Sequence, residues 1–131
     1  MSDLLAFASV PATAMVRIST ANTARDGTGT LGTLITAPTA GTRVDDIEIT
    51  AAGTTTAGVV RMFEYDGTNT RLLREFLIPA VTPSTTVAVY NLQLKNQAIV
   101  LKSGWSLKFG THNAETFNVF EIGRASCRER V

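Results

Sequence analysis

Proton-transfer chemistry near neutral pH would have to use His112, the single histidine of this chain. Glu115 lies three residues further on, so the two side chains could in principle form an acid–base pair or share a metal ion. A metal site needs three or four converging ligands, and this segment supplies too few of them. We therefore expect His112 to hydrogen-bond the turn at Asn113, and we retain it as a candidate for surface binding rather than for catalysis.

Carboxylates that could supply oxygen ligands to calcium are Asp45, Asp46 and Glu48, with Glu64 and Asp66 as partners. Their spacing matches no compact calcium-binding loop. We therefore expect them to be solvent-facing side chains of strands, and the sequence predicts no metal site.

Phosphate-binding and nucleophile motifs are incomplete. The segment 26–29 (DGTG) resembles part of a phosphate loop, but it lacks the lysine and the following helix that anion binding requires, so we expect a turn. Ser84 and Ser103 stand in no nucleophile-elbow context. The sequence therefore predicts no catalytic residue, no cofactor and a protein that is not an enzyme.

Trp105 and Tyr90 could stack on sugar rings, as aromatic side chains of carbohydrate-binding sandwiches do. Aromatic residues make up only 7% of the chain and most are phenylalanine, which argues against a flat aromatic platform. We expect Trp105 to fill the core at a sheet edge. Trp105, Tyr90 and His112 remain the candidate surface-binding residues.

The elements that would position these residues are strands. Threonine and valine are frequent and no long segment has the helix period, a pattern that suits pleated, half-buried strands. Segments rich in Asn, Asp, Gly and Pro separate them. The expected strands are 15–20, 30–37, 43–50, 56–65, 71–78, 85–94, 99–101, 105–110 and 115–120.

Two local features are predicted within this series. Val44 and Ile47 should both face inward although they are out of phase with a period of two, so a bulge is expected at 45–46. The turn formers at 66–69 should join the strands on either side into a hairpin. The many apolar residues of that hairpin place it at the heart of the domain.

Strands of this number, spaced near ten residues with turns between them, predict an all-β, two-sheet antiparallel sandwich. A jelly roll is the first choice, and an immunoglobulin-like sandwich is the alternative. Residues 1–14 should form an N-terminal arm or lead-in, and 15–121 the single domain.

Residues 122–131 (IGRASCRERV) are interpreted as a non-native tail. Their back-translation is one reading frame of a widely used sequencing-library adapter. The adapter has the bases AG directly before the codon of residue 122, and Glu121 can be encoded by GAG, which ends in these two bases. We therefore expect a metagenomic sequence whose native part is secure through Phe120. The alternative is a native basic tail that carries Arg124, Arg128 and Arg130 as an exposed nucleic-acid arm.

Without this tail, which carries three arginines and one glutamate, the formal net charge changes from +1 to −1. A nearly neutral body offers no electrostatic footprint for nucleic acid or for an anionic membrane. No apolar run is long enough to span a bilayer. The single cysteine, Cys127, also lies in the tail, so the body has no disulfide and no thiolate ligand.

Three segments resemble recurring blocks of a family of small, mostly uncharacterised proteins of tailed phages and prophages. They are 22–31 (NTARDGTGTL), 53–61 (GTTTAGVVR) and 111–119 (THNAETFNV). The resemblance covers most of the chain from 19 to 120. It implies a virion or virion-assembly context and supplies no catalytic set to carry over.

We therefore expect a non-enzymatic bacteriophage structural protein, a capsid decoration or accessory virion protein that acts through subunit contacts and is assembled in the bacterial host cytoplasm. A threonine-rich β-domain of low charge has little to keep identical copies apart, so its expected partners are itself, as a homotrimer, and phage capsid or tail proteins. The alternative is a host-surface glycan-binding module of a head or tail fibre, which would use loops at 23–30 and 110–115.

Overall fold

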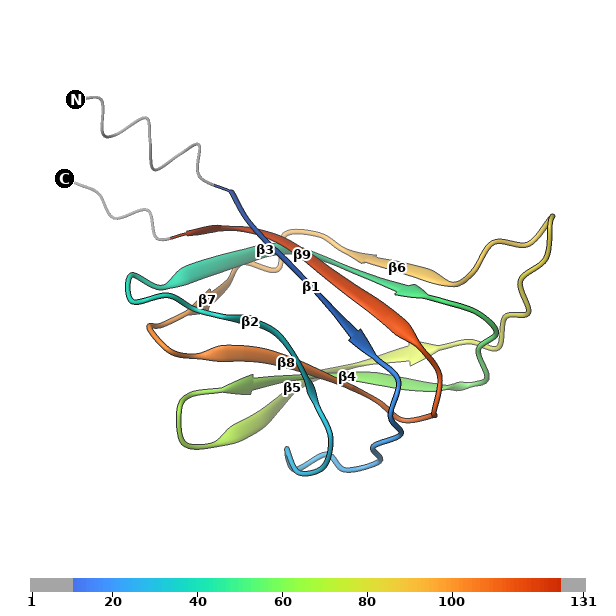
Figure 1. The fold of residues 1–131 in the computed structure, drawn as a ribbon, viewed down its shortest axis with the longest axis horizontal. Helices are drawn as coiled ribbons and strands as arrows, with labels where there is room; N and C mark the ends of the chain where they lie inside the picture. The colour runs from blue at the N-terminus through green and yellow to red at the C-terminus, as the bar shows by residue number, and fades with distance from the viewer. Residues whose placement is uncertain (1–10, 126–131) are drawn as a thin grey trace.

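The computed structural model describes residues 11–125, which contain nine strands and no helix. The strands form two antiparallel sheets packed face to face (Figure 1). Their bounds are β1 (Pro11–Ile18), β2 (Gly32–Thr36), β3 (Thr42–Ala51), β4 (Gly58–Tyr65), β5 (Thr70–Ile78), β6 (Asn91–Leu94), β7 (Ile99–Leu101), β8 (Ser106–Thr111) and β9 (Phe117–Ala125). The predicted all-β sandwich is confirmed.

The strand order is that of a jelly roll. One sheet has the order β1-β9-β3-β6, with β7 also paired to β3, and the other has the order β2-β8-β4-β5. Both β6 and β7 pair with β3, at opposite ends of it, so they act as one interrupted strand. The pairs are therefore nested, first with last and second with second-last, as in a long hairpin that has been rolled up. The alternative immunoglobulin-like sandwich has a different strand order.

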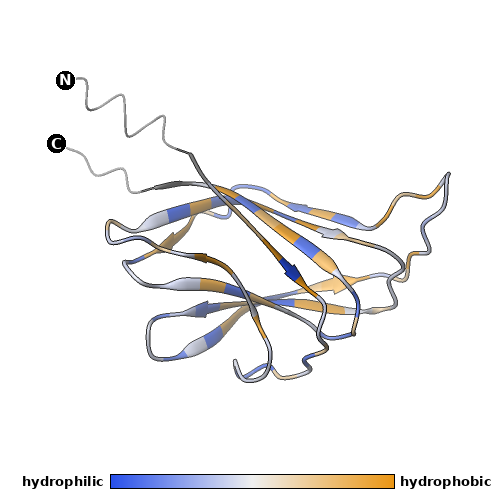
Figure 2. Cartoon of the chain, in the orientation of Figure 1, coloured by the Kyte–Doolittle hydropathy of each residue, from blue (hydrophilic) through white to orange (hydrophobic). Residues whose placement is uncertain are grey.

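Inward-facing residues of the central strands form the core. Alternation with a period of two directs every second side chain to the space between the sheets. Figure 2 shows hydrophobic and hydrophilic residues following one another along the strands. The largest contributors are Ile47 and Ile49 of β3, Met62 of β4, Leu107 and Phe109 of β8, and Phe117 of β9, all almost fully buried. Each such side chain contributes about 1.5–3 kcal/mol by leaving water.

Two local predictions are confirmed. The register between β3 and β9 shifts between Val44 and Asp46, which is the expected bulge. Residues 66–69 join β4 to β5 as the expected hairpin, whose turn is closed by Asp66 Oδ1 accepting from the amides of Thr68 and Asn69.

Two other predictions are wrong. β5 lies at the edge of its sheet rather than at the heart of the domain, and Leu73 and Leu77 on it are exposed. The expected strand 85–94 is real only at β6, because residues 79–90 leave the sheet. The strands also extend past the expected boundaries: β1 begins at Pro11, inside the expected lead-in, and β9 crosses 122 to end at Ala125. Residues 1–10 and 126–131 lie outside the described residues.

Candidate functional site: a basic groove beside a projecting arm

Arg61 is a charged residue in the middle of a buried strand. Its neighbours Val60 and Met62 point into the core, so strand alternation turns Arg61 to the outer face of the β2-β8-β4-β5 sheet. It is nevertheless only 1% exposed. The loop between β1 and β2, residues 19–31, crosses that outer face and covers it.

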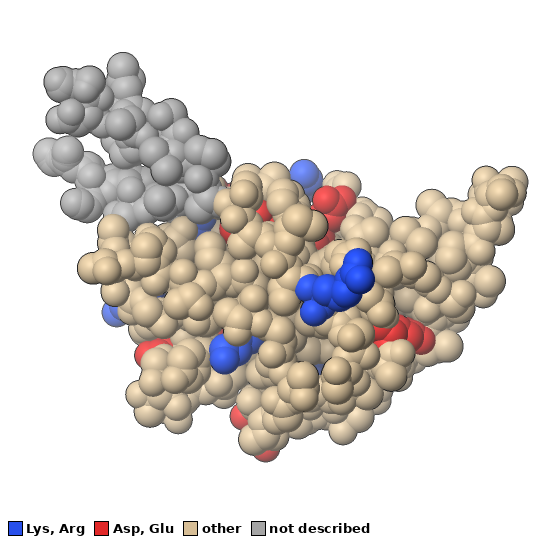
Figure 3. Space-filling model, in the orientation of Figure 1, with Lys and Arg blue, Asp and Glu red and all other residues tan. Residues whose placement is uncertain are grey.

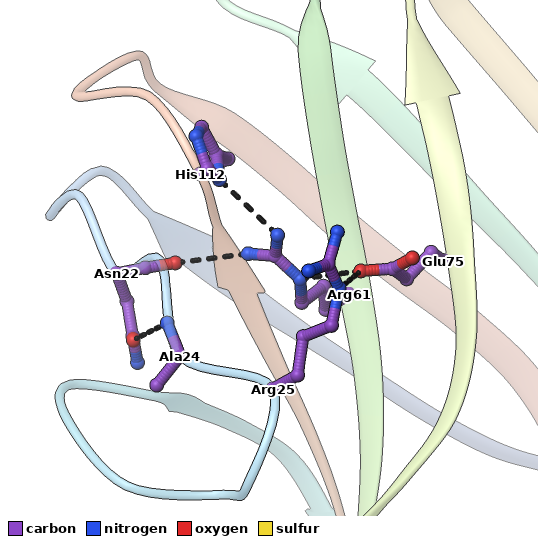
Figure 4. A network of polar contacts seen from close by, with 6 residues as sticks. All are labelled: Asn22, Ala24, Arg25, Arg61, Glu75 and His112. Carbon is purple, nitrogen blue, oxygen red and sulfur yellow. Dashed lines mark hydrogen bonds and ion pairs between the residues drawn. The ribbon is translucent and has the colours of Figure 1, made fainter.

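Each of the three nitrogens of the Arg61 guanidinium has a partner (Figure 4). Nε donates to Oε2 of Glu75 at 2.7 Å, and Nη1 donates to the backbone oxygen of Asn22 at 3.1 Å. Nη2 lies 3.1 Å from Nδ1 of His112. Because a guanidinium can only donate, Nδ1 must accept and the ring carries its hydrogen on Nε2. Arg61 therefore ties β4, β5, the 19–31 loop and the end of β8 together.

Glu75 is shared between two arginines. Its Oε2 also accepts from Nε of Arg25 at 2.5 Å, so Arg25 and Arg61 approach the same carboxylate oxygen from the loop and from β4. The hydrogen bond from Arg25, followed by that from Arg61, lowers the pKa of Glu75 below its usual value. The carboxylate is thus held charged beneath the loop.

Asn22 shapes the covering loop. Its Nδ2 donates to the backbone oxygens of Thr28 and Thr30, its Oδ1 accepts from the amide of Ala24, and its own amide donates to Thr111. Gly29 closes the loop with a φ of +84°, and a Cβ there would lie within 2.8 Å of the Asn22 side chain. The predicted turn at 26–29 is confirmed, since Asp26 Oδ1 accepts from the amide and hydroxyl of Thr28.

On the other side of Arg61, the 53–61 and 111–119 segments interlock. Glu115 Oε2 accepts from the amide of Thr56 at 2.8 Å and from its hydroxyl at 2.6 Å. Asn113 Nδ2 donates to Thr56 Oγ1 and to the backbone oxygen of Ala57, and it lies where a Cβ on Gly58 would be. The three segments quoted for the phage resemblance therefore converge around one arginine.

A groove of about 550 Å³ opens beside this network. We call it the basic groove; its lining residues are Arg25, Ala57, Gly58, Val59, Arg61, Leu77, Ile78, Pro79 and His112. The side chain of Arg25 is 63% exposed, and Leu77 is 80% exposed. No acidic residue is among the lining residues, but Arg25 and Arg61 share the carboxylate of Glu75, so the groove combines one net positive charge with an apolar wall.

An arm of residues 79–90 leaves the domain next to the groove and projects from the body (Figure 1). Its base is fixed by two backbone hydrogen bonds between Val81 and Thr55, and by the amide of Ala51 donating to Tyr90. Its tip is a turn in which Ser84 Oγ accepts from the amides of Thr86 and Val87. The arm contains no charged residue, as its uniform colour in Figure 3 shows.

The structure separates the three candidate surface-binding residues. His112 lies in the basic groove, but its ring contacts Arg61 rather than the turn at Asn113, and Glu115 turns away to Thr56. Trp105 precedes the opposite end of β8 and is half-buried against the core as expected, but β8 is an internal strand rather than a sheet edge. Nζ of Lys102 lies 5.5 Å from the centre of its ring. Tyr90 is half-buried at the base of the arm. Trp105 and His112 therefore share no surface.

Sequence reasoning missed Arg25 and Arg61. The only available signal was an arginine inside the apolar run VVRMF, where a charge on a central strand requires a partner. The carboxylates considered for calcium are dispersed: Glu48 accepts from Asn91 and Gln93, and Asp45 pairs with Arg43. Within residues 11–125 no group of three or more His, Cys, Asp or Glu side chains could hold a metal ion.

Glu121 is a second ionisable residue in an apolar environment. It follows Phe117 and Val119 on the inward face of β9 and is 0% exposed, and neither carboxylate oxygen has a hydrogen-bond partner among the described residues. Burial, with a smaller contribution from the charge of Asp45, raises the pKa of Glu121 to about 7. Glu121 is enclosed between the sheets, away from the basic groove.

No protein-family model matches this chain, and no curated protein shows a significant match to it. In the described part of the chain, no helix is long and apolar enough to cross a membrane. The fold and the groove thus define the chain as a jelly-roll domain that presents an uncharged arm beside a basic groove.

Proposed function

We propose that this protein is a non-enzymatic structural component of a bacteriophage particle, a capsid decoration or accessory virion protein that acts through subunit contacts. The observation that carries the proposal is the projecting arm of residues 79–90. An ordered, charge-free extension costs solubility in an isolated domain, and it gains a role when another subunit covers it. The resemblance of three segments to phage proteins supports the particle context.

The edge strand beside the arm supports the same proposal. β5 is one rim of its sheet and leaves one side of its backbone without a strand partner. Leu77 on this rim is 80% exposed, and Val87 in the arm is 45% exposed. Both side chains lie between the groove and the arm and carry no charge. If this surface of one copy packs on a different face of the next copy, the contact is heterologous and can close into a ring, for which we propose three subunits.

The test is the molar mass in solution, measured by light scattering coupled to size-exclusion chromatography. We expect three times the 14.0 kDa of one chain. Val87→Lys should shift the protein to monomer, because it places a charge in the covered surface. Thr68→Lys, at a position that is also exposed but lies in the turn at the other end of β5, is the matched control and should leave the trimer intact. A monomeric wild-type chain at tens of micromolar, or equal effects of both substitutions, would overturn the proposal.

A further inference from the structure

The basic groove has binding capacity that the domain itself does not use. Nε of Arg25 donates a hydrogen bond to Glu75, whereas the two terminal nitrogens of Arg25 make no hydrogen bond among the described residues. Nδ1 of His112 accepts from Arg61, so Nε2 carries the ring hydrogen, and His112 is among the lining residues of the groove. Leu77 supplies a bare apolar wall opposite them. Such a groove suits a peptide that carries a carboxylate next to aliphatic side chains.

The N-terminus of the chain has this composition. Residues 1–10 read MSDLLAFASV, in which Asp3 is the only charged side chain and is followed directly by Leu4 and Leu5. The charge of Asp3 complements Arg25, and the two leucines complement Leu77 and its neighbours. The segment and the groove therefore match in both charge and hydropathy.

The geometry favours a groove on another copy of the chain. β1 begins at Pro11 and ends at Ile18, which pairs with Phe117 at the end of the sandwich where His112 also lies. Pro11 is consequently a full strand length, about 23–26 Å, away from the groove. From Pro11 back to Asp3 the chain spans at most about 27 Å when fully extended. This reach is needed in full to cover the length of the strand. It is therefore too short to continue around to the outer face of the other sheet, where the groove of the same chain lies.

We propose that residues 1–10 of one copy bind the basic groove of a neighbouring copy, with the Asp3 carboxylate on Arg25 and His112 and with Leu4 and Leu5 against Leu77. This inference rests on the proposed function, since it adds a second contact between the same subunits, beside that of the arm and the β5 rim. The contact joins two different surfaces, so it can repeat from copy to copy, and a rotation of 120° between neighbours closes it into the proposed ring of three.

A charge exchange tests the contact in the full chain. Asp3→Arg and Arg25→Asp should each weaken self-association, measured by sedimentation velocity, by about tenfold or more. The double variant should regain the wild-type association, because the opposite charges again face each other. Arg71→Asp is the matched control: Arg71 is also 63% exposed and bound to one carboxylate, Asp66, but it lies outside the groove. Its association should equal that of the wild type.

A peptide assay separates this inference from the proposed function. A fluorescein-labelled peptide MSDLLAFASV should bind the Asp3→Arg chain, because the altered N-terminus of that chain no longer competes for the groove. Fluorescence anisotropy should show about tenfold weaker binding when Arg25→Ala is added to this chain, and unchanged binding when Arg71→Ala is added instead. Absence of binding, or equal binding by all three chains, would overturn the inference. If the Asp3→Arg chain remained a trimer, the inference would fail while the proposed function stood. If the wild type were a monomer, the proposed function would fail and the peptide would still decide on the groove.

Discussion

Nη2 of Arg61 donates to Nδ1 of His112 across 3.1 Å, although 51 residues separate the two in sequence. This contact sets the tautomer of the only histidine, a lining residue of the basic groove, with the ring hydrogen on Nε2. The buried Arg61 thus holds the half-buried His112 ring in place at the wall of the groove.

Replacing Arg61 should destabilise the fold more than replacing any exposed arginine. Arg61→Leu leaves the Asn22 oxygen and His112 Nδ1 without their donors, so we expect a loss of about 2–4 kcal/mol in the free energy of unfolding. Chemical denaturation measures it, with Arg71→Leu as the control, expected within about 0.5 kcal/mol of wild type. Similar losses in the two variants would mean that the Arg61 contacts contribute nothing beyond a surface ion pair.

Gly29 and Gly67 provide a matched pair for the covering loop. Both have positive φ, +84° and +96°, but a Cβ on Gly29 meets Asn22 whereas one on Gly67 meets nothing within 4 Å. Gly67→Ala should therefore cost only the conformational penalty, about 1 kcal/mol, and Gly29→Ala should cost more because the loop must also shift. Thermal unfolding ranks the two; a Gly67 variant less stable than the Gly29 variant would contradict the role given to Asn22.

Glu121 should make the protein less stable as the pH rises. Its pKa in the folded state, about 7, is above the ordinary value of 4.5. The folded state therefore holds its proton more tightly than the unfolded state does, and stability that is complete below pH 4.5 is lost as the pH rises through 7. The loss is at most about 3 kcal/mol.

Substitutions identify Glu121 as the source of this pH dependence. Glu121→Val should be more stable than wild type at pH 8, and its melting temperature should no longer fall between pH 5 and pH 8 because the titrating group has gone. Glu121→Gln should also abolish the dependence, while retaining an unpaired buried polar group. A wild-type melting temperature that is flat or rising across this range would show that Glu121 has a partner when the chain folds.

Glu75 should act in the opposite direction. The arginines lower its pKa in the folded state, so its contribution is present above the ordinary glutamate pKa and is lost as the pH falls below it. We expect Glu75→Gln to have a lower melting temperature than wild type at neutral pH and a smaller drop upon acidification. Parallel curves for the two proteins on the acid side would exclude a role for the Arg25–Glu75–Arg61 contacts in acid stability.

The position of Glu121 also bears on the interpretation of the tail. Phe117, Val119 and residue 121 share the inward face of β9, and a residue of apolar type is what that face favours at 121. If the last two bases of codon 121 come from the adapter, the residue at 121 is set by those bases and not by the needs of the buried position. An adapter origin would therefore account for a carboxylate that has no partner there. The adapter origin of residues 122–131 stays a prediction, which sequencing the source locus through codon 121 would test.

The sequence by itself determined the strands and their inward faces. Alternation and β-branched residues depend only on neighbours in the chain, which is why all nine strands, the bulge at Asp45 and the turn at 66–69 could be predicted. The same local information favoured a strand at 85–90, because alternating Val and Ala satisfy the strand pattern whether or not a partner strand is present.

Only the tertiary structure decided which strand lies at an edge and which side chains meet. β5 reads as a core strand but has one neighbour, because the order of strands is set by how the long hairpin rolls up rather than by any segment alone. The basic groove depends on that order, since Asn22, Arg61 and His112 approach one another only after three distant segments pack. Their hydrogen bonds require fixed distances in space, and no spacing along the chain encodes those distances.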